Sequence, residues 1–195
     1  QSCYRNQSDH LLFHICPLTL AKFRPLCCKF SYICRLIYCT NMRITLITTG
    51  KTTFDYIREG MSIYEKRIGR YLNFSRTEVP ALQSTSSLSH EEVKRREGEL
   101  ILKKVKPEDR VVILDEKGRR FTSTGWAGHI GHLMDTGTKS LVFIIGGAYG
   151  FSDKVRERAD ETLSLSDMTF SHQIIRLFFE EQLYRAMTII RGEPY

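Results

Sequence analysis

The chain has 195 residues, of which 42% are hydrophobic and 26% are charged, as is typical of a soluble globular protein. This length accommodates one well-packed domain and is short for two. The net charge of +7 is unevenly placed, because residues 1–41 hold five Lys or Arg and a single acid. Residues 42–195 hold 24 basic and 21 acidic residues, a net charge of +3, so the overall pI of 9.2 does not indicate nucleic-acid binding.

Residues 1–41 are expected to form a leader outside the folded domain. All six cysteines lie in this segment, with a spacing that matches no zinc motif, so we expect no metal site. Basic residues interrupt its apolar stretches, so we expect no membrane-spanning helix. Because it is basic and poor in acids, the leader could be an organelle transit peptide. Alternatively it is translated sequence upstream of a start at Met42, which is the interpretation we favour.

Hydrophobic patterning after Met42 predicts strands that alternate with helices. Short β-branched or continuous apolar runs predict strands, and apolar residues at helical spacing predict helices. In chain order the predicted elements are a strand at 43–49, a helix at 54–71, a strand at 74–79, a loop at 83–89, a helix from a Ser89–Glu92 capping box to Lys104, a strand at 110–115, a helix through 126–134, a strand at 141–145, a short helix at 152–159, a strand at 162–165 and a helix at 173–190. This alternation predicts an α/β fold with an open, mostly parallel sheet and helices on both faces.

Three segments with functional potential follow predicted strands. They are LDEKG at 114–118, GGAYG at 146–150 and the passage from strand to helix at 163–173. In open parallel sheets, ligands bind outside the carboxyl ends of the strands, where these segments should meet. Taken alone, the glycine pair is most simply a tight turn, and its G-G-x-x-G spacing fails the dinucleotide fingerprint. A lone His172 would be a cap or surface residue, but beside a glycine turn it becomes a candidate proton acceptor or base contact.

The last predicted helix is apolar on nearly all sides, which indicates a buried helix or one in an oligomer interface. Its charges lie four residues apart, so ion pairs are predicted between Arg176 and Glu180 and between Glu181 and Arg185. Two arginines on a buried helix need a further purpose, and contact with phosphate or a base would supply one.

Taken together and in this order, the segments resemble the RlmH family, the 23S ribosomal RNA pseudouridine N3-methyltransferases of the SPOUT class. The matching residues are Val111–Asp115, Phe143-Ile144-Ile145-Gly146-Gly147-x-x-Gly150, Leu163-Ser164-x-Ser166-x-Met168-Thr169-x-x-His172-Gln173, Arg176, Glu181-Gln182-x-Tyr184-Arg185-Ala186 and Arg191–Tyr195. Ile44–Gly50 with Lys51, and Tyr64–Arg67 on the first helix, match as well. The resemblance covers residues 42–195.

The resemblance implies a C-terminal trefoil knot, S-adenosyl-L-methionine as the cofactor, and a homodimer whose composite active site is completed across the interface. The implied cofactor-binding residues are Leu114, Gly146, Leu165, Ser166, Asp167, Met168, Thr169 and Phe170. His172 and Arg185 are the implied catalytic residues, and Arg176 and Tyr195 are the implied RNA contacts. The implied substrate is ribosomal RNA in the large subunit or the whole ribosome. The implied location is the cytoplasm, or a plastid or mitochondrion if the leader is a transit peptide.

Two departures from the family pattern raise alternatives. Ser171 stands where bacterial members usually have proline, and the chain ends at Tyr195 where the family usually continues for one or two residues. A non-catalytic homologue that binds RNA or ribosomes is therefore one alternative. Independently of these departures, a nucleotide-dependent oxidoreductase is the alternative enzyme, and it would bind NAD instead of S-adenosylmethionine.

Overall fold

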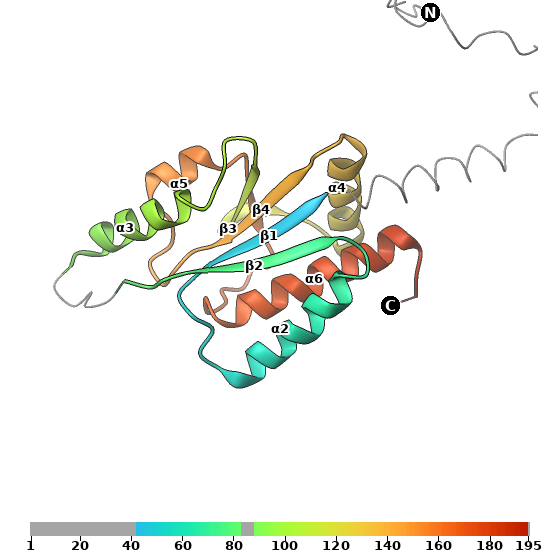
Figure 1. The fold of residues 1–195 in the computed structure, drawn as a ribbon, viewed down its shortest axis with the longest axis horizontal. Coiled ribbons are helices and arrows are strands. Elements are labelled where there is room, and N and C mark those ends of the chain that lie inside the picture. Colours follow the sequence, from blue (N-terminus) through green and yellow to red (C-terminus); the bar gives the residue numbers. More distant parts are fainter. Residues whose placement is uncertain (1–41, 83–87, 195) are drawn as a thin grey trace, which may run out of the picture. The chain divides into compact units, whose positions relative to one another are not determined.

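The computed structural model describes residues 42–82 and 88–194, which belong to one compact unit. Within these residues, five strands form one sheet in the order β2-β1-β4-β3-β5, and each pairing in it is parallel (Figure 1). The strands are β1 (Arg43–Thr49), β2 (Asn73–Val79), β3 (Arg110–Arg120), β4 (Ser140–Ile145) and β5 (Glu161–Ser164). The predicted parallel α/β fold is confirmed.

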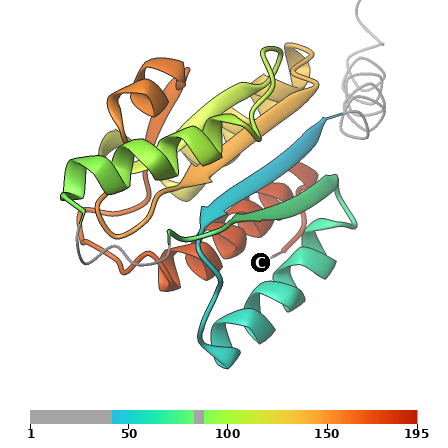
Figure 2. The ribbon, with the colours of Figure 1, turned by 60° about the vertical axis from the view of Figure 1, so that its left-hand side comes forward.

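Helices cover both faces of the sheet. They are α2 (Asp55–Ile68), α3 (His90–Leu102), α4 (Ser123–Asp135), α5 (Asp153–Arg158) and α6 (Ile174–Arg191). Helices α3 and α5 lie on one face and α2 and α6 on the other, and α4 shares the hydrophobic core of α6 (Figure 2). None of these helices of the described chain is long and apolar enough to cross a lipid bilayer.

The predicted element boundaries hold to within a few residues except at β3, which was expected to end at Asp115 and continues to Arg120. Half of the predicted capping box is confirmed, because the Ser89 hydroxyl accepts a hydrogen bond from the Glu92 amide at 3.2 Å. The Glu92 carboxylate pairs instead with Arg95 and Arg96. The leader at 1–41 and most of the predicted loop at 83–89 lie outside the described residues.

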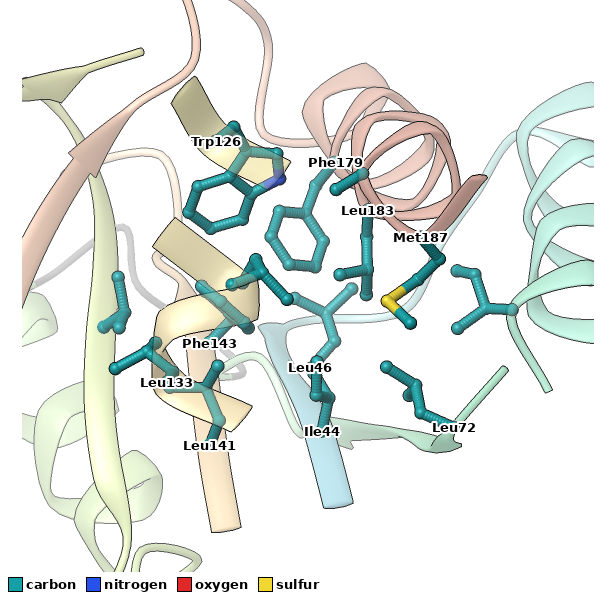
Figure 3. Packing of buried hydrophobic residues seen from close by; sticks show 14 of the residues in the cluster. Ile44, Leu46, Leu72, Trp126, Leu133, Leu141, Phe143, Phe179, Leu183 and Met187 are labelled. Atoms are coloured by element: carbon teal, nitrogen blue, oxygen red, sulfur yellow. The ribbon is translucent and has the colours of Figure 1, made fainter. Parts of the chain in front are cut away.

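The main hydrophobic core lies between α6 and the centre of the sheet (Figure 3). Phe179 packs on Phe143 of β4 with ring centroids 4.7 Å apart, and Leu183 and Met187 continue the contact towards Leu46 of β1. Strand β4 is buried along its whole length because it lies between β1 and β3 and has helices on both faces. This explains why its sequence is a continuous apolar run and not an alternating one.

A carboxylic acid, Glu180, lies in this core next to Phe179. Its side chain is fully buried, and its nearest cation, the Arg76 guanidinium, is 3.9 Å away. Burial and, secondarily, the charge of Glu65 raise the pKa of Glu180 to about 9, although Arg76 acts in the opposite direction. At neutral pH the folded protein therefore holds Glu180 protonated.

Glu180→Gln is expected to remove a pH dependence of stability. In the unfolded chain the carboxyl ionises near pH 4.5, whereas in the fold it keeps its proton up to about pH 9, so this group lowers stability as pH rises through that window. Within that window, this group lowers the free energy of unfolding by about 1.4 kcal/mol per pH unit. Urea unfolding of the wild type and of Glu180→Gln at pH 5 and pH 8 measures this difference. An equal change of the unfolding free energy with pH in the two proteins would show that Glu180 ionises in the fold.

Candidate functional site

A pocket opens at the carboxyl ends of β3, β4 and β5, which are neighbours in the sheet. Its volume is about 530 Å³, and its wall is built from three stretches of chain, within 114–117, 145–151 and 163–175, together with Arg156 of α5. The three segments predicted to meet at this edge of the sheet therefore do meet. A pocket of this size at the strand ends is the usual place for a small ligand in such a fold.

The first wall is the glycine turn after β4. Gly150 has a φ of +82°, and its amide donates to the carbonyl oxygen of Gly147 at 3.2 Å, which closes the turn. Helix α3 supports the turn from behind: Tyr149 stacks on His90 with centroids 4.1 Å apart, and a Cβ atom at Gly147 would lie 2.6 Å from the Glu97 carboxylate. Residues 146–151 of the turn line the pocket.

The second wall is the middle of β3. Leu114 and Arg119 both pair with Leu163 of β5, so residues 115–118 leave the ladder and bulge into the pocket wall. Gly118 closes the bulge by lying directly on the backbone of β5, and a Cβ atom there would come within 2.5 Å of the Leu163 carbonyl carbon. The trefoil knot that the resemblance implies stays a prediction.

The third wall is the passage from β5 to α6. The Ser166 hydroxyl accepts from the Met168 amide at 2.9 Å, and the Ser166 carbonyl accepts from the Ser164 hydroxyl at 2.9 Å, so the loop is held by its own serines. Met168 and Phe170 expose 77% and 39% of their surface at the rim of the pocket. Large apolar side chains that are exposed beside a pocket are suited to contact a ligand or a partner chain.

His172 lines the pocket and is half-buried, just before α6 begins. Burial and then the nearby charge of Arg176 hold the pKa of His172 below its ordinary value. The imidazole is therefore neutral at pH 7 and free to accept a proton from a bound substrate. The preceding Ser171 supports this turn, since its hydroxyl accepts a hydrogen bond at 3.3 Å from the amide of Ile174, the first residue of α6.

Arg176 is fully buried, and its guanidinium is used within the fold. It donates to the carbonyl oxygens of Thr49 at 2.6 Å and Gly50 at 2.9 Å, to the Thr52 hydroxyl at 2.9 Å and to the His172 carbonyl oxygen at 2.9 Å. We call this set of contacts the Arg176 clamp. RNA has no access to the guanidinium in this arrangement, so the expected RNA contact of Arg176 is replaced by a role inside the molecule.

The two ion pairs predicted on α6 have different outcomes. Glu181 and Arg185 are paired, with a carboxylate-to-guanidinium distance of 2.5 Å. The pair between Arg176 and Glu180 was wrong, because Arg176 binds carbonyl oxygens of the β1–α2 loop and Glu180 points into the core near Arg76. Spacing by four residues permits a pair on one helix face, but burial against the sheet gave each group other neighbours.

Arg185 lies on α6 three turns beyond Ile174, about 16 Å along the helix axis. It does not line the pocket, so within one chain it does not meet His172. Tyr195 lies outside the described residues.

Of the eight residues expected to bind the cofactor, seven line the pocket, and Asp167 instead pairs at the surface with Arg120.

Comparison with known proteins identifies the chain. Among solved structures, a probable methyltransferase from Bordetella pertussis Tohama I superposes with a TM-score of 0.47 at 9% identity, over 80% of this chain and 99% of that one. Residues 42–195 match the family described as predicted SPOUT methyltransferases. Proteins named ribosomal RNA large subunit methyltransferase H from Christiangramia forsetii and Parabacteroides distasonis are each 48% identical over 154 residues, which is 79% of this chain and 98% of each relative. The chain belongs to the RlmH family of SPOUT methyltransferases.

The methyl donor of SPOUT methyltransferases, S-adenosylmethionine, suits the chemistry of the pocket. Its sulfonium is a cation, which the Glu116 carboxylate in the wall would face, whereas the Asp115 carboxylate is already paired with Arg156 at 2.8 Å. Its adenine and methylene groups need apolar contacts, which Leu114 and Leu165 of the lining would provide, and backbone groups of the glycine turn would supply hydrogen bonds. No phosphate has to be held, which agrees with the absence of a dinucleotide fingerprint in the GGAYG segment.

Sequence reasoning did not assign some residues of this RlmH pocket. Asp115, Glu116 and Lys117 belong to the LDEKG segment that was predicted to lie at the pocket, but none of the three was assigned a contact of its own. Arg156 had no signal, because it reaches the wall through an ion pair of 2.8 Å with Asp115, 41 residues away in sequence. Tyr149 occupies one of the two unspecified positions of the G-G-x-x-G pattern, so the motif gave it no role.

Proposed function

We propose that this protein methylates N3 of a pseudouridine in large-subunit ribosomal RNA, with S-adenosylmethionine as the methyl donor. The observation that carries the proposal is that His172, whose pKa is lowered by burial and then by the charge of Arg176, lines the strand-end pocket together with the glycine turn. The relatives that the chain matches over 98% of their length are named as ribosomal RNA large subunit methyltransferases, which supports the substrate class.

The chemistry required of the protein is proton acceptance, alignment and exclusion of water. The bound cofactor supplies an electrophilic methyl group on a positively charged sulfur. N3 of the pseudouridine carries a hydrogen, which His172 accepts as the nitrogen–carbon bond forms and the carbon–sulfur bond breaks. Met168 and Phe170 at the rim shield the reacting atoms from water, and the backbone of the glycine turn fixes the donor.

The active enzyme in this proposal is a homodimer with composite sites. Arg185 can act at the pocket only if it comes from a second copy, since Arg185 of the same chain is about 16 Å along α6 from its start. Phe170 and Phe178 stack with centroids 5.0 Å apart at the side of α6 nearest the pocket and offer an apolar surface for that copy. Arg185 would then orient His172 or the RNA of the neighbouring protomer.

Transfer of a labelled methyl group to assembled ribosomes tests the proposal. We expect incorporation into the large-subunit RNA of ribosomes that contain the pseudouridine, and none into ribosomes from a strain that lacks the corresponding pseudouridine synthase. Because residues 42–195 carry a net charge of only +3, naked RNA should be a poorer substrate than the folded ribosome, the more so at high salt. Binding to ribosomes without methyl incorporation would identify a non-catalytic homologue instead.

A further inference from the structure

The Arg176 clamp contains a buried cation whose four acceptors are three carbonyl oxygens and a hydroxyl, and not a carboxylate. Burying a guanidinium is costly, and an apolar residue of similar volume would fill the same space at lower cost. A cation held in this way is therefore expected to have a task besides filling the core. The identity of its acceptors indicates what that task is.

The clamp joins the start of α6 to the loop between β1 and α2. Gln173 strengthens the joint, since its side-chain oxygen accepts from the Thr53 amide at 3.0 Å and its nitrogen donates to the Lys51 carbonyl at 3.2 Å. Gly50 has a φ of +77°, which turns its carbonyl towards Arg176. Three consecutive carbonyls, of Thr49 at the end of β1 and of residues 50 and 51 in the loop, thus bind side chains at the start of α6.

The same guanidinium holds the main chain of His172 through the hydrogen bond from its Nε atom. His172 precedes the first residue of α6, where no complete turn of helix fixes the backbone. The clamp therefore determines where the imidazole stands relative to the sheet edge that carries the pocket.

We propose that Arg176 is a positioning residue for methyl transfer: it fixes His172 against the β1–α2 loop so that the imidazole lines the pocket. The proposal rests on the proposed function, in which His172 accepts the N3 proton. Arg176 itself does not touch the substrate.

The electrostatics around His172 agree with this role. After burial, the charge of Arg176 is the next cause that lowers the pKa of His172. The other charged groups that line the pocket are the acids Asp115 and Glu116 and the cations Lys117 and Arg156. The charges of Glu78 and Arg76 of β2 act on the guanidinium of Arg176. Of these groups, Arg176 is the one hydrogen-bonded to His172.

The test compares Arg176→Gln, which removes the charge, with Arg176→Lys, which keeps it but loses the forked geometry. Glu180→Gln is the matched control, because it changes a fully buried polar residue one helical turn away on the same helix. In the full-length protein we would titrate the His172 ring by NMR and measure single-turnover methyl transfer on ribosomes against pH.

Arg176→Gln is expected to raise the pKa of His172, to move the acidic limb of the pH–rate profile to higher pH, and to lower the rate at pH 7 by roughly 10- to 100-fold with little change in KM. Arg176→Lys should lower the rate but leave the acidic limb of the pH–rate profile at the same pH. The control, Glu180→Gln, should match the wild type in its rate and in its pH–rate profile. A ring titration unchanged in Arg176→Gln, with activity loss that tracks unfolding, would overturn the proposal. The NMR readout needs no activity, so it separates this outcome from failure of the proposed function.

Discussion

Replacing His172 by alanine is expected to reduce methyl transfer by roughly 100- to 10,000-fold, because the imidazole is the candidate acceptor for the N3 proton in the pocket wall. Cofactor binding should remain close to that of the wild type, since the glycine turn and the serine-held loop after β5 do not depend on this side chain. Single-turnover transfer to ribosomes measures the first quantity, and calorimetric titration with S-adenosylmethionine measures the second.

His132→Ala is the matched control, because His132 is an exposed histidine on α4 and is no part of the pocket wall. It should leave transfer unchanged. Coexpression of His172→Ala with Arg185→Ala chains extends the test, since in a composite homodimer each mixed dimer keeps one site with both native residues and regains activity. Full activity in His172→Ala alone would remove this residue from the mechanism.

The arrangement of the fold could be predicted from the sequence because its signals are local. The β-branched run at 43–49 and the continuous apolar runs at 110–115 and 141–145 each identified a strand. In a parallel sheet, the ends of such strands meet at one edge, so the order of the elements also predicted that LDEKG, GGAYG and the segment before α6 would share a pocket. The resemblance to the RlmH family then gave chemical meaning to that pocket.

Contacts between distant residues could not be predicted in this way. Arg176 binds acceptors 124 to 127 residues away, and nothing in the local pattern distinguishes these from a carboxylate four residues along the same helix. The continuation of β3 to Arg120 was missed because residues 115–118 are polar and leave the ladder before pairing resumes. The Arg176 contacts and the continuation of β3 depend on how α6 and β5 pack against segments that are distant in sequence. The residue pattern of a single segment does not show this packing.

Gly118→Ala is expected to lower the free energy of unfolding by about 3 kcal/mol or more, although it adds one methyl group. An added Cβ atom would lie 2.5 Å from the Leu163 carbonyl carbon and 2.7 Å from the amide nitrogens of Leu163 and Ser164. These are backbone atoms of a paired strand, so no side-chain rotation relieves the overlap. Chemical denaturation with urea, monitored by circular dichroism, measures the change.

Gly128→Ala provides the control, because Gly128 is an exposed glycine within α4 and an added Cβ atom there meets nothing within 4 Å. This variant should be more stable than the wild type by roughly 0.5 to 1 kcal/mol, as alanine is the better helix former. Gly118→Ala should also weaken binding of S-adenosylmethionine, since residues on both sides of the overlap line the pocket. A stable Gly118→Ala protein with unchanged cofactor affinity would show that β3 and β5 can separate here without disturbing the site.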